Sequence, residues 1–129
     1  MFFTAEGLAF LAERHLATCT TIRADGRPHV TPVGFTWEDA TGLARVITSG
    51  SSVKARNAAS GRSLLLCQVD GRRWLTLEGT AEVRADAEAV GIAERLYAQR
   101  YRPPRSNPRR VAVEIRVVRA YGSAHLLST

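Results

Sequence analysis

The sequence predicts a mainly β protein, a small antiparallel barrel of six strands with a few short helices. Asp25-Gly26 and Asp70-Gly71 each lie between two runs of β-forming residues, and Asp-Gly is a strong signal for a tight hairpin. The last strand is the clearest, because apolar residues alternate with charged or small ones from Val111 to Val118. Short hairpins, with helices before the fourth and the sixth strand, favour a closed sheet over an open one.

The first half of the chain contains a helix and three of the strands. A short amphipathic helix is expected from Thr4 to about Arg14, with the Thr4 hydroxyl as its cap. The strands are predicted at residues 16–23, 30–37 and 43–48. The first two of them form the hairpin around Asp25-Gly26.

The second half alternates helices and strands. A short helix is predicted at residues 53–59, an almost continuously apolar strand at 63–69 and a long strand at 72–85. Asp86 caps the next helix, and Pro103-Pro104 ends it because proline cannot continue a helix. Gly34 and Gly79 lie inside predicted strands, where they allow the bends that a closed sheet requires.

The composition is that of an ordinary globular chain. With 129 residues, of which 45% are hydrophobic and 23% charged, and with no repeat or composition shift, we expect a single domain over residues 1–129. No apolar run is long enough to span a membrane, and the N-terminus lacks the basic stretch of a signal peptide. We therefore expect a cytoplasmic protein in which Cys19 and Cys67 are thiols rather than a disulfide.

The charge balance favours an anionic partner. The net charge is +6, and every one of the 18 basic residues except Lys54 is an arginine. Arginine suits phosphate and carboxylate groups, although a strong arginine bias also arises from genome composition. The single lysine is therefore the more informative residue.

The first candidate site is the run from Thr48 to Lys54, which leads into a helix. Hydroxyl groups at Thr48, Ser49 and Ser52, free N–H groups at the helix start and one ammonium group can together satisfy the oxygens of a phosphate. The run lacks the spacing of a Walker loop, and serine-rich loops also simply cap helices. The run therefore predicts either a phosphate site or a simple helix cap.

The second candidate is the strand from Pro28 to Phe35. Pro28 and Pro32 cannot donate hydrogen bonds to a neighbouring strand, so this strand needs an edge position or a ligand beside it. A flat ring system could lie against it and accept hydrogen bonds from unpaired N–H groups. The alternative is an edge strand protected against aggregation.

Two further segments combine arginine with other ligand-binding groups. The hairpin tip from Gln68 to Trp74 joins an amide, two guanidinium groups and an indole, which suits an aromatic acid, although a tryptophan at a strand start is also typical of a core or an interface. The segment from Arg102 to Arg110 carries four arginines around three prolines. It is interpreted as an open loop for an acidic ligand.

The sequence contains no recognisable catalytic motif. His15, His29 and His125 lie far apart, and no nucleophile motif or metal-binding spacing occurs, so we expect no metal. Redox chemistry would then come from a bound cofactor, with the protein supplying orientation and electrostatics.

Several segments carry a likeness to a known family over nearly the whole chain. Arg23 to Val30, Ala44 to Thr48 and Lys54 to Asn57 resemble the pyridoxamine-phosphate-oxidase-like split-barrel superfamily. The segments at 69–79 and 97–110 resemble its actinobacterial deazaflavin-dependent branch, in particular the coenzyme F-420-dependent biliverdin reductases.

This resemblance implies an FMN-binding type of split barrel, a homodimer, and a deazaflavin held at the dimer interface. The implied reaction transfers a hydride from reduced coenzyme F-420 to biliverdin, giving bilirubin, with no catalytic residue. The phosphate is implied near Ser52, Lys54 and Asn57, and the ring along residues 29–33. Contacts across the dimer are implied for Gln68, Trp74, Arg109 and Arg110. The candidate cofactor-binding residues are therefore His29, Val30, Thr31, Pro32, Val33, Thr48, Ser49, Ser52, Lys54, Asn57, Gln68, Trp74, Arg109 and Arg110.

Alternatives to this function remain. One is an FMN-binding oxidoreductase of the same fold, since fold alone does not settle function. Another is a basic barrel that binds nucleic acid or stores a cofactor without turnover. The expected partners are a second copy of the chain and a small-molecule substrate, not nucleic acid or a membrane.

Overall fold

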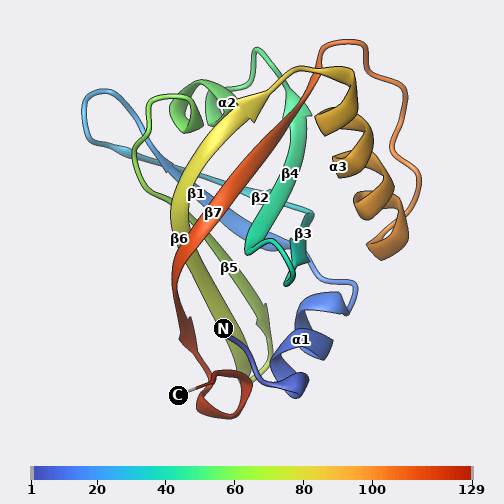
Figure 1. Ribbon diagram of the computed structural model, residues 1–129. Helices are drawn as coiled ribbons and strands as arrows, with labels where there is room; N and C mark the ends of the chain where they lie inside the picture. The colour runs from blue at the N-terminus through green and yellow to red at the C-terminus, as the bar shows by residue number, and fades with distance from the viewer. Residues whose placement is uncertain (1, 129) are drawn as a thin grey trace.

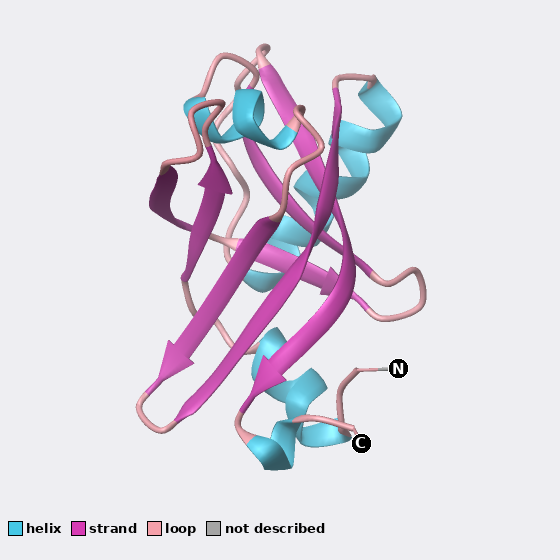
Figure 2. Cartoon of the chain, turned by 90° about the vertical axis from the view of Figure 1, so that its left-hand side faces the viewer, coloured by secondary structure: helices cyan, strands magenta, loops and turns pink. Residues whose placement is uncertain are grey.

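The computed structural model describes residues 2–128, which form one antiparallel sheet with helices around it (Figures 1 and 2). The strands are β1 (Ala17–Ile22), β2 (Pro28–Val33), β3 (Phe35–Glu38), β4 (Leu43–Ser49), β5 (Leu64–Asp70), β6 (Arg73–Arg84) and β7 (Arg110–Gly122). The helices are α1 (Ala5–Ala12), α2 (Val53–Ala58), α3 (Ala87–Arg100) and the 3-10 turn η1 (Ala124–Leu126). The predicted elements are present within about two residues, with two exceptions: the strand predicted at 30–37 is divided in two, and the last strand continues beyond Val118 to Gly122.

The strand order shows why the sheet curls into a partly closed barrel. The order is β2-β1-β5-β6-β7-β4-β3, so β2 and β3 are the two edges of the sheet. Only Gly34 separates these strands in the chain, so the Cα atoms of Val33 and Phe35 are at most about 7 Å apart. The sheet must therefore bend until its two edges meet at this glycine.

The predicted count of six strands is wrong, because the segment from Val30 to Trp37 is two strands. β2 pairs with β1, whereas β3 pairs with β4 on the other edge. Between them, a Cβ atom at Gly34 would lie 3.0 Å from ring carbons of Tyr97 and Tyr101, so a glycine allows the close approach of α3. The period-two pattern of the sequence cannot show that a strand changes partners within one run.

The core fills the inside of the curled sheet. Phe35, Leu66, Leu77 and Ile115, from four different strands, are fully buried there. Along β5 the buried side chains alternate with half-buried ones, as the pleat requires. Gly79 is also where the β6–β7 register shifts, and its missing side chain leaves room for the Arg116 carbonyl group. The bend predicted at Gly79 is thus present as a β-bulge.

Three helices are capped by residues just before them. Thr4, Ser52 and Asp86 accept hydrogen bonds from the backbone N–H groups of Gly7, Ala55 and Ala89. α1 packs against η1 at the end of the barrel where both termini lie, and α3 lies outside the sheet against β3, β4 and β7 (Figure 1). None of the described helices is both long and apolar enough to cross a membrane.

Cys19 and Cys67 are free thiols on opposite faces of the sheet. Cys19 pairs with Leu66, so its neighbour Thr18 pairs with Cys67, and successive residues of a strand point to opposite faces. Burial raises the pKa of the Cys19 thiol to about 11, while nearby Lys54 acts in the opposite direction.

Candidate functional site

A basic cavity of about 600 Å³ lies where the two edges of the sheet meet α3. Its walls come from Pro32, Val33 and Gly34, from the end of β4, from Lys54 of α2, from Tyr97 of α3 and from the loop at 102–110. The structure therefore brings together three segments that the sequence offered separately: the proline-bearing strand, the serine-rich run and the arginine loop. We call this space the Lys54 cavity.

Tyr101 fixes the position of the arginine loop. Its hydroxyl group donates to the His15 carbonyl oxygen at 2.6 Å and accepts from the Phe35 N–H at 3.2 Å. Burial raises the pKa of Tyr101, so the hydroxyl keeps its proton for this bond. The helix end is thereby tied to the start of β3, and the residues after it pass over the cavity.

The serine-rich run is bound to the same loop from the other side. The Asn107 amide donates to Ser49 Oγ at 3.0 Å, and the Gly50 N–H donates to the Arg109 carbonyl oxygen at 2.9 Å. Ser52 is already occupied, because its Oγ accepts from the Ala55 N–H at 3.2 Å and from Thr48 Oγ1 at 3.0 Å. Its described role is to cap α2 and hold the run in place.

The charges on the cavity wall are all positive. Lys54, Arg102, Arg105 and Arg110 line the cavity, and no aspartate or glutamate is among the described residues that do. Of these four cations only Arg110 forms an ion pair in the described chain, with Glu94 at 2.7 Å. A cavity with this lining attracts an anionic ligand and can hold several acid groups.

The end of β2 lines the cavity, and the rest of the strand lies outside it. Pro32 and Val33 line the cavity, whereas His29, Val30 and Thr31 lie further along the strand and do not. His29 Nδ1 and Thr31 Oγ1 are buried, yet neither has a hydrogen-bond partner. Buried polar groups are normally paired, so these two atoms are exceptions to the usual pattern.

Four other candidate residues lie outside the cavity. Gln68 is fully buried, where its amide donates to the Phe10 carbonyl oxygen at 2.8 Å and accepts from Arg100 at 2.6 Å. Asn57 donates to the buried Thr21 hydroxyl at 3.0 Å. Arg109 lies in the loop, with its N–H bonded to Asn107. These three side chains do not face the cavity in the single chain.

Trp74 also lies away from the Lys54 cavity. It is at the β5–β6 hairpin, at the end of the barrel near α1, whereas α2, which carries Lys54, lies towards the other end (Figure 1). Its ring meets Tyr121 edge-on, with centroids 6.2 Å apart. Both side chains are 39% exposed, which suits a surface that another molecule covers.

Sequence reasoning missed Tyr97 as a site residue and did not place Arg102 and Arg105 beside Lys54. Tyr97 lies within the predicted helix that Asp86 caps, where an aromatic residue is also typical of the core. The usable signal was its spacing of four from Tyr101, which puts both rings on one helical face just before the prolines. The meeting of distant segments depends on where the sheet edges join, which no local pattern contains.

The chain is similar to known proteins over nearly its whole length. Residues 3–124 match the family model described as pyridoxamine 5'-phosphate oxidase. A biliverdin reductase of Mycobacterium tuberculosis that depends on reduced coenzyme F-420 is 58% identical over 122 residues, which are 95% of this chain and 89% of that protein.

Solved structures show the same fold. An F-420 reductase superposes with a TM-score of 0.72 at 21% identity, covering 88% of this chain and 94% of the other. A conserved hypothetical protein of Mycobacterium tuberculosis superposes with a TM-score of 0.80 at 26% identity, covering 94% of this chain and 84% of the other.

Proposed function

The chain belongs to the pyridoxamine 5'-phosphate oxidase family, and from this premise we propose that it is a coenzyme F-420-dependent reductase that converts biliverdin to bilirubin. The support for this activity is the relative that is 58% identical over 95% of the chain. The structural observation that carries the proposal is the Lys54 cavity, whose charged lining residues are all cations.

The residues of the cavity fit a planar cofactor with an acidic tail. Lys54, Arg102 and Arg105 are free to bind phosphate or carboxylate groups, since no ion pair in the described chain includes them. Pro32 and Val33 offer a flat apolar edge for the ring. We propose that the ring extends along the same strand towards Thr31 and His29, which lie outside the cavity itself.

The protein's contribution is binding and orientation. When bound, the reduced deazaflavin supplies the hydride. Lys54 and the arginines hold the anionic end, and the hydrogen bonds of Asn107 and Ser52 hold the loops that carry them. We assign no catalytic residue, because no histidine, cysteine, aspartate or glutamate is among the described residues that line the cavity.

We further propose that the protein works as a homodimer in the cytoplasm. The outward residues of β2, β1 and β5 carry no charge, although 30 residues of the chain are charged (18 basic and 12 acidic). They are Pro28, Val30, Pro32, Thr18, Thr20, Ile22, Leu65, Cys67 and Val69. We call these nine residues the outer face.

The outer face continues into neighbouring parts of the molecule. Val30 and Val69 are more than half exposed, and Val69 pairs with Trp74 on the adjacent strand. Pro32 belongs both to this face and to the Lys54 cavity. A second copy on this face would therefore border the cofactor, and Trp74 is a candidate for contact with it. Exposed apolar patches of this kind mark interaction sites.

The proposal is tested by titrating the protein with coenzyme F-420 and with FMN side by side, with binding followed by fluorescence. We expect saturable binding of the deazaflavin, weaker binding of FMN, and turnover of biliverdin when the deazaflavin is reduced. Tighter binding of FMN would instead make the protein a flavin enzyme of the same fold. Binding of the deazaflavin without turnover would leave a cofactor-storage protein.

A further inference from the structure

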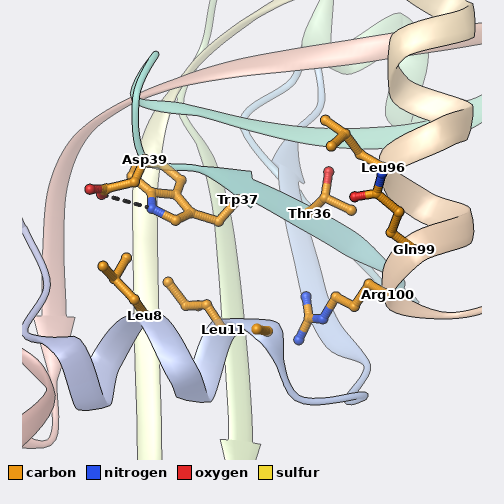
Figure 3. A pocket seen from close by; sticks show the side chains of 9 residues that line it. Leu8, Leu11, Thr36, Trp37, Asp39, Leu96, Gln99 and Arg100 are labelled. Atoms are coloured by element: carbon orange, nitrogen blue, oxygen red, sulfur yellow. Dashed lines mark hydrogen bonds between the residues drawn. The ribbon is translucent and has the colours of Figure 1, made fainter.

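A second cavity, of about 370 Å³, lies between α1, β3 and α3 (Figure 3). Leu8, Leu11 and Ala12 of α1 form its floor, and Trp37 and Leu96 form the apolar part of its walls. None of its lining residues belongs to the Lys54 cavity. Its volume lies within the range of small-molecule sites. We call it the Arg100 cavity.

Arg100 brings a positive charge that forms no ion pair in the described chain to this cavity. Its guanidinium group donates to the carbonyl oxygens of Glu13 and Phe35, at 2.9 and 2.5 Å, and to Gln68 Oε1 at 2.6 Å. All three acceptors are neutral, and within residues 2–128 Arg100 takes part in no ion pair. Burial lowers the pKa of Arg100, while the charges of Tyr101 and Glu13 act in the opposite direction.

This arrangement differs from that of three other arginines. Arg45, Arg73 and Arg110 each have a carboxylate within 2.9 Å. Arg100 is held as firmly as these by its three hydrogen bonds, but two of its five N–H groups are left for another acceptor. A buried cation normally has an anionic partner, and the open side of Arg100 is the cavity.

Thr36 adds an unpartnered polar group to the same wall. Its side chain is only 6% exposed, and its hydroxyl group has no hydrogen-bond partner. Figure 3 shows Thr36 on the same side of the cavity as Leu96, Gln99 and Arg100. A buried hydroxyl group is usually paired, so a ligand atom is the partner that this position lacks.

The carboxylate of the cavity is at its opposite end and is already engaged. Asp39 accepts from Trp37 Nε1 at 3.1 Å, and Figure 3 shows this pair on the far side from Arg100. The cavity therefore has one positive end, one negative end and an apolar floor between them. An anionic group belongs at the Arg100 end, away from Asp39.

From these contacts we propose that the Arg100 cavity is a second ligand site, which takes a small monocarboxylic acid with an apolar body. The carboxylate meets Arg100 and the Thr36 hydroxyl group, and the apolar body lies on the leucines of α1 and on Leu96. The inference does not depend on the deazaflavin, because the two cavities share no residue.

Octanoate is a suitable probe, with octanol as its uncharged match. The full-length, isotope-labelled protein is titrated with each compound, and binding is followed by NMR at the Thr36 amide and the Trp37 indole N–H. We expect saturable shifts with octanoate and binding of octanol that is about tenfold weaker or more, since charge-assisted hydrogen bonds are lost. Equal affinity for the two compounds, or no saturation with octanoate, would overturn the proposal.

Variants locate the site. Leu96→Trp fills the cavity and should abolish octanoate binding, whereas Ala85→Trp adds the same ring to an exposed loop and should leave it unchanged. Arg100→Gln should weaken octanoate binding about tenfold or more without weakening octanol. Arg100 also holds α3 in place, so its replacement changes more than the charge of the cavity. Thr36→Val provides a second test, because it removes the hydroxyl group, keeps the shape of the side chain and should also weaken octanoate binding.

Two other results would also count against the site. Shifts confined to residues of the Lys54 cavity would assign octanoate to the cofactor site instead. Protection of the Trp37 indole by a second copy of the chain, with octanoate excluded, would show that the cavity is part of an interface.

Discussion

At the scale of single residues, Lys54 is the side chain on which the proposed function depends most. The sequence singled it out because it is the one lysine among 18 basic residues, and the structure places it in a cavity with three arginines. Its neighbour Ser52 shows the limit of that reasoning. A serine before a helix predicts either a cap or an anion ligand, and only the geometry shows that its hydroxyl group is already used as a cap.

Replacing Lys54 by alanine should weaken deazaflavin binding by about 1.5 to 3 kcal/mol, the usual value of a hydrogen bond to a charged group. Fluorescence titration measures this effect. The matched control is Arg62→Ala, which removes one positive charge from an exposed loop outside the cavity and should leave the affinity unchanged. Equal affinity of Lys54→Ala and the wild type would remove Lys54 from the site.

Glu13 provides a prediction about pH. Hydrogen bonds from Arg73, at 2.9 Å to each oxygen, lower its pKa from 4.5 to about 2, with a further contribution from His15. A carboxyl group whose folded pKa is depressed stabilises the protein above its unfolded pKa. This stabilisation is lost as the pH falls from about 4.5 towards 2.

The measurement compares unfolding of Glu13→Gln and the wild type across this pH range. The variant should be less stable at neutral pH, and the difference should shrink as the pH approaches 2. Glu88→Gln, at an exposed carboxylate with no ion pair in the described chain, should show no such convergence. A constant difference between Glu13→Gln and the wild type would contradict the ion pair with Arg73.

At the scale of elements, local signals predicted most of the strands and helices correctly. The Asp-Gly pairs mark the β1–β2 and β5–β6 hairpins, and Thr4, Ser52 and Asp86 cap their helices. The exception is the division of one predicted strand at Gly34. Its two halves have different partners, and this depends on the closure of the sheet rather than on the residues near Gly34.

Replacing Gly79 and Gly91 by alanine should have opposite effects on stability, because Gly79 allows a close backbone contact whereas Gly91 only lowers helix propensity. Gly79→Ala should destabilise the protein by about 2 kcal/mol or more, because the new methyl group would overlap the Arg116 carbonyl group at the bulge. Gly91→Ala lies within α3 with only the end of Arg95 nearby, and should stabilise by about 0.5 to 1 kcal/mol through helix propensity. Thermal unfolding of both variants checks the signs. A tolerated alanine at residue 79 would mean that the bulge relaxes freely.

At the scale of the whole molecule, the Lys54 cavity is a product of the closed sheet. The proline-bearing strand, the serine-rich run and the arginine loop were each identified from the sequence, yet their meeting was not. They come together because Gly34 joins the two sheet edges and because Tyr101 ties α3 to them. The uncharged outer face is likewise distributed over three strands and becomes visible only when their register is known.

The proposed dimer predicts a change in assembly. Val30→Asp places a charge at an exposed position of the outer face and should convert the dimer to a monomer, as measured by light scattering or analytical ultracentrifugation. Ala85→Asp places the same charge on an exposed loop away from this face and should leave the dimer intact. If Val30→Asp stays dimeric, another surface forms the contact.

Cys19 and Cys67, whose thiols lie on opposite faces of the sheet, allow dimer dissociation to be followed by chemical labelling. Cys67 is half-buried on the outer face, whereas Cys19 is buried inside and its pKa is raised to about 11. A maleimide should therefore alkylate Cys67 alone, and it should do so faster in the Val30→Asp variant than in the wild type. The rate of labelling would then follow dissociation of the subunits without any engineered tag.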